Sequence, residues 1–163
     1  GVSQRELLAP FACLQPMYNV AKRQAEVEIL PLAEHEGLGV ISYSPVGGGL
    51  LSGKYGIRQR PDHGRLIDTP TYQKRYGDDA YYEIAERFVD HARAIGEHPV
   101  SLAVAWVMAH PAVTTPIIGA RSVEQLEPSL AAIDVQMDPE RYAAIAALSS
   151  TPPPATDRTE DQA

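Results

Sequence analysis

Two short segments of the chain combine residue types that could bind an anion. The run 44–54 holds three consecutive glycines and ends on Lys54. Glycines allow backbone N–H groups to approach a phosphate, and a lysine can neutralise part of its charge. The run 117–122 places Arg121 where a strand-like Ile-Ile pair meets the expected start of a helix. Helix N-termini favour anions and the planar arginine fork suits a phosphate, so both segments predict phosphate binding.

Neither segment is diagnostic by itself. The glycines match neither the Walker A nor the G-x-G-x-x-G pattern, and the chain has no G-x-S-x-G nucleophile motif. Structural roles are the alternative: Tyr43 as a strand aromatic, Arg121 as cover for a helix end, and Ser122 with Gln125 as a capping box. If both segments lie at the mouth of one parallel α/β fold, they suit a ligand with separated phosphates, and a phosphorylated dinucleotide is one such ligand.

The histidines and the single cysteine indicate neither a metal site nor a disulfide framework. The histidines are scattered along the chain, whereas structural zinc sites need close ligand pairs, so we expect a metal-independent protein. Cys13 lies in the apolar run 11–14, and it is predicted to be a small buried side chain.

Composition excludes several classes of protein. Hydrophobic residues make up 44% of the chain and charged residues 21%, which is typical of a globular domain. The net charge of -7 argues against a nucleic-acid surface, which needs a basic stripe. No apolar run reaches the roughly 20 residues of a membrane span, and no signal-peptide pattern is present. We therefore expect a cytoplasmic protein that binds neither nucleic acid nor membrane.

Strand-like and helix-like segments alternate, which predicts an α/β fold with a parallel sheet. A closed eight-stranded barrel takes about 250 residues, so the chain has room for about half of one. Residues 1–150 are expected to form this domain, the segment 55–77 a long functional or mobile loop, and residues 151–163 a disordered tail. The expected strands are 1–3, 11–15, 38–43 and a buried 115–118, and the expected helices are 24–36, 81–95, 99–109, 122–133 and 138–148.

An ordered set of motifs resembles the aldo-keto reductase family over about residues 1–150. The branch that it resembles includes bacterial reductases and the potassium-channel β subunits. This branch also has a proline in the helix that carries Pro31. The motifs read QPMYNV (15–20), EILPLA (28–33), GVISYSP (39–45), GLLSGKY (49–55), AVAW (103–106), PIIGA (116–120) and EQL (124–126).

The resemblance implies the C-terminal half of a (β/α)8 TIM barrel that reduces aldehydes or ketones by hydride transfer from NADPH, without a metal. Ser3 and Gln15 would hydrogen-bond the nicotinamide carboxamide, and Tyr43 would stack on the nicotinamide ring. Gly119, Arg121 and Gln125 would hold the adenosine end, with Arg121 near the 2′-phosphate. Arg65 is a further candidate for a phosphate contact. The pyrophosphate would be lined by Ser44, Pro45, Gly47, Leu50, Ser52 and Lys54.

Three departures from the family pattern limit what the resemblance implies. The family's catalytic tyrosine and its helper residues lie in the N-terminal half, so no tyrosine of this chain is assigned that role. Gly1-Val2-Ser3 resembles the end of the fifth barrel strand, yet the sixth begins near Phe11, and a parallel crossover takes at least about ten residues. We favour missing residues over a deleted helix there. Pro128-Ser129 replaces a Glu-Asn pair that touches adenine in this branch, which puts the adenine contact in question.

Three hypotheses for function follow. The first is an NADPH-dependent carbonyl reductase of which this chain supplies the cofactor-binding half. The alternative is a non-catalytic half-barrel that binds a nucleotide or a partner. The third is a truncated product with no function of its own. The expected partners are a small-molecule carbonyl substrate and either the N-terminal half-barrel or a second copy of the chain. A half-barrel exposes two strand edges, so the isolated polypeptide is predicted to dimerise or to be poorly soluble.

Overall fold

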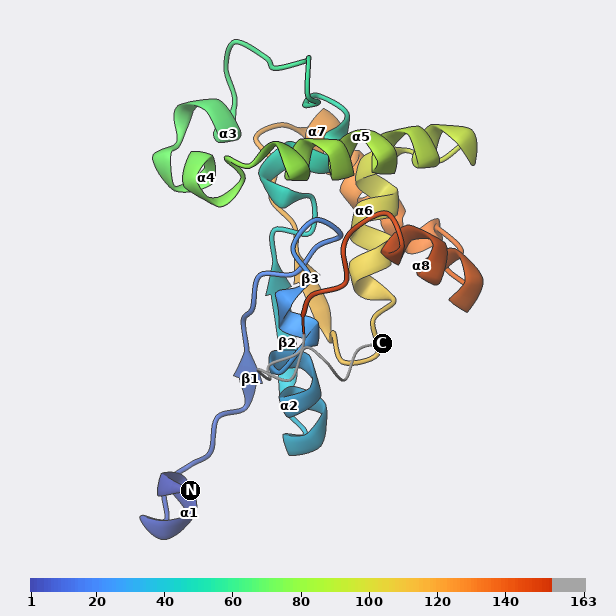
Figure 1. The fold of residues 1–163 in the computed structure, drawn as a ribbon. Helices are drawn as coiled ribbons and strands as arrows, with labels where there is room; N and C mark the ends of the chain where they lie inside the picture. The colour runs from blue at the N-terminus through green and yellow to red at the C-terminus, as the bar shows by residue number, and fades with distance from the viewer. Residues whose placement is uncertain (154–163) are drawn as a thin grey trace.

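The centre of the molecule is a parallel sheet of three short strands in the order β1-β2-β3. The computed structural model describes residues 1–153, apart from the side chain of Gln4. β1 (Cys13–Leu14) pairs with β2 (Gly39–Tyr43), and β2 pairs with β3 (Thr115–Ile117), with Tyr43 opposite Ile117. All pairs are parallel, which confirms the predicted α/β class. The carboxyl ends of β2 and β3 therefore meet at one edge of the sheet (Figure 1).

The helices begin and end where local signals place them. The side chain of Asp78 accepts a hydrogen bond from the Ala80 N–H and caps α5 (Asp79–Ala94). His98 caps α6 (Pro99–Met108), and Asp138 caps α8 (Pro139–Ala146). Gly37, with φ of 66°, ends α2 (Ile29–Glu36) in the left-handed conformation that glycine adopts freely.

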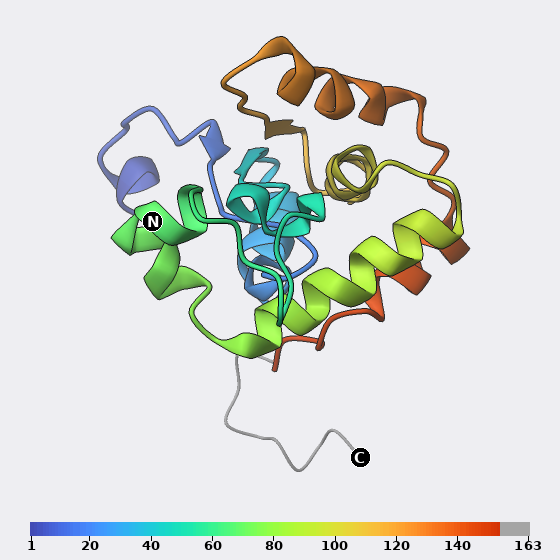
Figure 2. The same cartoon turned by 90° about the horizontal axis from the view of Figure 1, so that it is seen from above.

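The core forms where the helices pack on the sheet. Trp106, Leu102 and Phe88 are fully buried, and they lie on α6 and α5. Figure 2 shows α6 in yellow, nearly end-on, between α5 in green and the orange segment that contains α7 (Val123–Leu130). Every residue of α6 from Ser101 to Val107 is buried, so α6 is the central helix of the structure.

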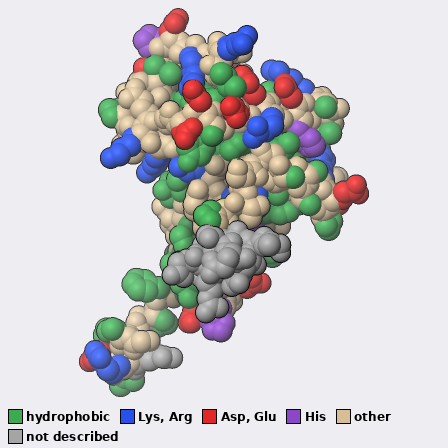
Figure 3. Space-filling model, viewed as in Figure 1, with side chains coloured by type: hydrophobic (Ala, Val, Ile, Leu, Met, Phe, Trp, Pro, Cys, Tyr) green, Lys and Arg blue, Asp and Glu red, His purple; other side chains and the backbone are tan. Residues whose placement is uncertain are grey.

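Residues 1–3 do not form the predicted strand. Val2–Arg5 is a short helix, α1, at the end of an arm that Figure 1 shows extending away from the sheet. A strand needs a neighbour for its backbone groups, and no described residue pairs with this segment. The N–H groups of Arg5 and Glu6 are instead satisfied locally by the carbonyls of Gly1 and Val2. Figure 3 shows hydrophobic side chains exposed along this arm, where Leu7 is 93% and Phe11 82% exposed.

The predicted helix 24–36 is divided in two, because Val27 and Glu28 lie between two separate helical segments. A 3-10 turn, η1 (Gln24–Glu26), precedes α2, so Pro31 falls in the first turn of α2, where its missing N–H costs no intrahelical bond. On α2, Leu30 is buried, whereas Leu32 is 52% exposed.

Other expectations also need correction. Cys13 is exposed rather than buried, since it lies on the outer strand β1. β3 is likewise an outer strand, and its residues are exposed or half-buried rather than buried. The segment 55–77 contains two short helices, α3 (Arg65–Asp68) and α4 (Pro70–Arg75). From residue 154 on, the predicted disordered tail lies outside the described residues.

Candidate functional site

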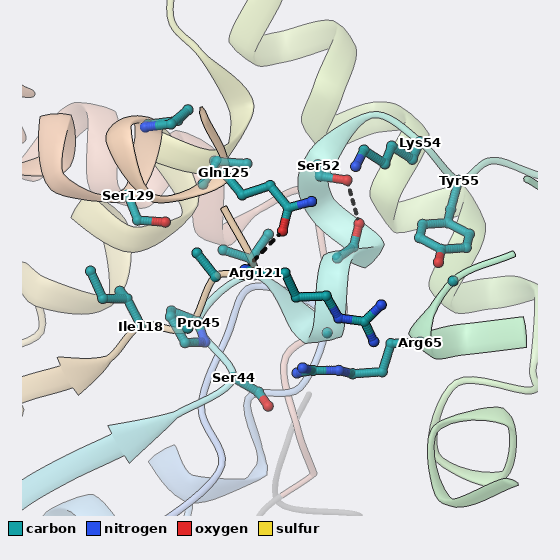
Figure 4. A pocket seen from close by; sticks show the side chains of 18 of the residues that line it. Ser44, Pro45, Ser52, Lys54, Tyr55, Arg65, Ile118, Arg121, Gln125 and Ser129 are labelled. Carbon is teal, nitrogen blue, oxygen red and sulfur yellow. Dashed lines mark hydrogen bonds between the residues drawn. The ribbon is translucent and has the colours of Figure 1, made fainter. Parts of the chain in front are cut away.

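A cavity of about 640 Å³ lies at the carboxyl ends of β2 and β3. Its walls are the turn after β2, the segment that joins β3 to α7, and the α3–α4 segment. Figure 4 shows side chains that enter it from all three. The predicted cofactor-binding residues that line it are Tyr43, Ser44, Pro45, Ser52, Lys54, Gly119, Arg121 and Gln125.

Four of the predicted site residues are not among those that line the cavity. Gly47 and Leu50 are buried inside the turn that forms its wall. Gln15 follows β1, which β2 separates from β3, and its side chain is exposed elsewhere. Ser3 lies in α1, on the arm that leads away from the strand ends. The structure therefore brings together the predicted phosphate-binding residues, whereas the two predicted carboxamide contacts lie elsewhere.

The backbone turns sharply where β2 ends. Ser44 has φ of 58°, a left-handed conformation that costs a residue other than glycine about 1–2 kcal/mol. Two hydrogen bonds to its carbonyl stabilise this turn, from the Asn19 side-chain amide at 2.9 Å and from the Gly47 N–H at 2.9 Å. The fully buried Asn19 is itself held, because its Oδ1 accepts the N–H groups of Ala21 and Lys22. Ser44 is thus fixed beside Tyr43 at the mouth of the cavity.

The glycines that follow are required by two features of the turn η2 (Gly47–Ser52). Gly47, Gly48 and Gly49 all have positive φ, at 61°, 69° and 103°. A Cβ on Gly48 would also lie only 2.7 Å from Cδ1 of Tyr72. One face of Gly48 is therefore covered by the Tyr72 ring. The turn is closed by the Ser52 hydroxyl, which donates to the Gly49 carbonyl at 2.6 Å.

The start of α7 differs in detail from the predicted capping box. Ser122 is the N-cap residue, but its side chain makes no capping hydrogen bond. Gln125 Oε1 instead accepts the N–H of Arg121 at 3.2 Å, one residue earlier than the motif requires. The Arg121 side chain is exposed, and Figure 4 shows it extending from this segment over the cavity.

The cavity carries an excess of positive charge in a chain whose net charge is -7. Lys54, Arg65 and Arg121 line it, each from a different segment. Within residues 1–153, none of them forms an ion pair with a carboxylate. Glu124 is the carboxylate that the described part of the chain contributes to the lining, and hydrogen bonding from Ser122 lowers its pKa. This arrangement can bind an anionic ligand.

Tyr72 is a pocket residue that the sequence interpretation missed. It lines the cavity from α4. Burial raises the pKa of the Tyr72 hydroxyl, but hydrogen bonds with Ser44 and Arg65 and the charges of Arg65 and Arg75 outweigh it, and the net pKa is lowered. The sequence does contain a signal for this helix, because Pro70 followed by Tyr72 and Tyr76 is typical of a short helix with one aromatic face. His63, His98 and Tyr55 also line the cavity and were not predicted.

The described part of the chain shows neither a candidate metal site nor a candidate membrane span. Residues 1–153 contain no group of three or more His, Cys, Asp or Glu side chains placed to hold a metal ion. No helix in the same range is both long and apolar enough to cross a membrane.

A cavity at the carboxyl ends of parallel strands is the usual position of the ligand site in α/β proteins, both barrels and open sheets. Residues 3–150 match the aldo/keto reductase family, and the chain belongs to this family of oxidoreductases. It is 39% identical over 133 residues to the "Uncharacterized oxidoreductase YrpG" of Bacillus subtilis, covering 77% of this chain and 36% of that protein. It is 27% identical over 141 residues to "Protein tas" of Escherichia coli, covering 86% of this chain and 40% of that protein.

Structural similarity agrees with the family. The glycerol dehydrogenase AKR11B4 from Gluconobacter oxydans superimposes with a TM-score of 0.69 at 27% identity, over 88% of this chain and 43% of that one. The chain therefore forms part of a TIM barrel, which confirms the predicted fold family. It spans between 36% and 43% of the length of these relatives.

Proposed function

We propose that this chain is the cofactor-binding part of an NADPH-dependent oxidoreductase that reduces aldehydes or ketones. The observation that carries the proposal is the convergence of Lys54, Arg65 and Arg121 on one cavity without carboxylate partners among residues 1–153. Aldo-keto reductases use NAD(P)H, a ligand whose phosphates are separated in space. A cavity of about 640 Å³ is also within the usual size range of small-molecule sites, about 300–1,000 Å³.

The residues that line the cavity fit the nicotinamide ring, the pyrophosphate and the 2′-phosphate of such a cofactor. The half-buried Tyr43 would support the nicotinamide, which supplies the reducing equivalents when the cofactor is bound. The turn from Ser44 to Ser52, with Lys54 at its end, would hold the pyrophosphate. Arg121 would bind the 2′-phosphate that distinguishes NADPH from NADH, since the guanidinium fork suits a phosphate.

Pro128 and Ser129 line the cavity at the proposed adenine end. The Ser101 hydroxyl donates to the Pro128 carbonyl at 2.6 Å. This bond ties α7 to α6 and occupies an acceptor that could otherwise face the ligand. We propose that adenine is held by packing, and that Arg121 dominates recognition of the adenosine half.

Direct titration tests this function. Isothermal titration calorimetry of the chain with NADPH should give saturable binding with one site per chain. Trp106, the single tryptophan, is fully buried in α6, so its emission also reports whether the fold is intact. A chain that unfolds cooperatively and yet binds no NADPH at millimolar concentration would refute the proposal.

A non-catalytic binding function is the second candidate. It rests on the cavity itself, because Lys54, Arg65 and Arg121 could bind an anionic ligand whether or not hydride transfer follows. General acid catalysis alone contributes about 10²–10⁴ to a rate, so the presence or absence of turnover is readily measured. Steady-state assays of the chain with NADPH and an aldehyde, with and without an added N-terminal half-barrel, separate the two candidates. Turnover that appears only with the added half supports the enzyme; binding without turnover in both supports the alternative.

A further inference from the structure

The short helix α4 packs two tyrosines against the glycine turn. Tyr72 and Tyr76 are one turn apart, and the Tyr76 N–H donates to the Tyr72 carbonyl at 3.0 Å. Their rings stack with centroids 6.4 Å apart. Tyr76 is fully buried, and its hydroxyl accepts a hydrogen bond from the Asn19 amide at 3.2 Å. The same amide group fixes Ser44, so α4 and the end of β2 are held in one arrangement.

Tyr72 occupies the outer position of this pair, where its ring covers Gly48. Glycine is needed there both for its positive φ of 69° and for the close approach of the ring. Tyr72 therefore lies at the edge of the cavity, in contact with the segment 44–54 that the sequence predicts to bind a phosphate.

Two arginines lie beside the Tyr72 ring. The guanidinium carbons of Arg65 and Arg75 are 5.4 and 5.3 Å from its centre. Within residues 1–153, neither arginine forms an ion pair with a carboxylate. Tyr72, Ser44 and Arg65 all line the same cavity. Ser44, Arg65 and Tyr72 thus offer three hydrogen-bond donors to one cavity, and the charge of Arg75 lies beside the Tyr72 ring. This set complements a phosphate oxygen.

We propose that Tyr72 is a cofactor-binding residue whose hydroxyl donates to the pyrophosphate of the dinucleotide, beside Ser44 and Arg65. The inference rests on the proposed function and adds to it a residue from α4. Hydrogen bonds from O–H groups to anionic oxygens are among the strong ones in proteins. The pyrophosphate is common to NADPH and NADH, whereas the 2′-phosphate is not. Tyr72 should therefore act equally on both nucleotides, unlike Arg121.

The test compares Tyr72→Phe with the unchanged chain in calorimetric titrations with NADPH and with NADH. The substitution keeps the ring on Gly48 and removes only the hydroxyl. We expect both dissociation constants to rise by a similar factor of about ten or more, as for the loss of one hydrogen bond to a charged group. Tyr82→Phe is the matched control, because Tyr82 lies on α5 outside the cavity, and it should leave both constants unchanged.

Each other outcome has a defined meaning. If the unchanged chain binds neither nucleotide, the proposed function fails and this inference fails with it. If the unchanged chain binds both and Tyr72→Phe binds them equally well, only the role of Tyr72 is overturned. Loss of NADPH affinity alone would place the hydroxyl at the 2′-phosphate and would also overturn it.

A second measurement covers the case in which Tyr72→Phe does not fold. The ultraviolet titration of tyrosine in the unchanged chain is recorded with and without inorganic pyrophosphate. An anion beside Tyr72 disfavours its phenolate, so saturating pyrophosphate should shift the first tyrosine ionisation to higher pH. An unshifted titration curve would contradict the proposal.

Discussion

The side-chain amide of Asn19 donates to the backbone oxygen of Ser44 across 2.9 Å, although 25 positions separate the two residues in sequence. The same amide reaches the hydroxyl of Tyr76. A single buried side chain thus connects the segment after β1 with the end of β2 and with α4. The wall of the cavity depends on this connection, because Ser44 is left-handed and is stabilised there by hydrogen bonds rather than by its own preference.

Asn19→Ala should therefore lower stability and loosen the site together. The substitution leaves the N–H group of the buried Ala21 without an acceptor, whereas Lys22 N–H keeps the Asn19 carbonyl; a buried unsatisfied group costs about 1–3 kcal/mol. Urea unfolding at neutral pH should show a loss in that range, with weaker NADPH binding in the folded protein. Gln136→Ala, at an exposed position, is the control and should change stability by less than about 0.5 kcal/mol. A stability change for Asn19→Ala as small as that of the control would contradict the assigned role.

Arg121→Ala should change the selectivity between the two nucleotides. The guanidinium is exposed at the start of α7, without a carboxylate partner among residues 1–153, so its removal should not affect the fold. NADPH affinity should fall about tenfold or more, and NADH affinity should change by less than about twofold, since only NADPH carries the 2′-phosphate. Calorimetry with both nucleotides gives the ratio, and Arg5→Ala on the N-terminal arm is the control. Equal losses for the two nucleotides would exclude the 2′-phosphate as the target.

Nucleotide affinity should fall at alkaline pH because the Tyr72 hydroxyl loses its proton. Its pKa lies below the ordinary value of 10, because the effects of Ser44, Arg65 and Arg75 outweigh burial. The groups that face it are these three and Tyr76, and both guanidinium groups keep their charge throughout. As pH rises through the lowered pKa, the hydroxyl becomes a phenolate, which repels a phosphate and cannot donate.

Affinity measurements between pH 7 and pH 10 check this dependence. The unchanged chain should lose NADH and NADPH affinity as pH rises, whereas Tyr72→Phe should bind weakly but with a flatter profile. A parallel decline in the two proteins would assign the pH effect to other groups.

Local signals determined much of what could be predicted of the fold. The apolar spacing of α5 and Pro99 at the start of α6 both depend on residues within one or two helical turns. The predicted strand at 1–3 failed because a strand is defined by its neighbours, and local sequence does not reveal whether a neighbour is present. Exposure of Cys13 has the same origin, since an apolar run does not show which strand is outermost.

The candidate site was predictable in part for the same reason. The runs around Lys54 and Arg121 were recognisable because each is short and lies at the junction of two elements. Tyr72 was not, because its approach to Gly48 depends on how α4 folds back over the turn. The Asn19–Ser44 hydrogen bond also joins distant parts of the chain, and no spacing rule predicts it.

Alkaline pH should destabilise the fold through Tyr76. Burial raises the pKa of Tyr76 to about 12, above its ordinary value of 10. A group with a raised folded-state pKa contributes full stability below the unfolded-state pKa and loses it as pH rises toward the folded-state value. The free energy of unfolding should therefore be lower at pH 11 than at pH 8, with roughly 1 kcal/mol due to Tyr76. Urea unfolding at the two pH values measures the difference, and equal or higher stability at pH 11 would contradict it.

The outer strands should make the 163-residue chain self-associate. β1 and β3 each have one edge without a partner among the described residues, and Phe11, next to β1, is 82% exposed. Unpaired edges flanked by apolar side chains favour pairing with another chain, and a charge placed there opposes it. Light scattering after gel filtration should show dimers or larger species for the unchanged chain and a smaller fraction for Phe11→Lys. Arg58→Lys, which is exposed and preserves charge, is the control and should associate like the unchanged chain. A monodisperse monomer that melts cooperatively would show that the edges need no partner.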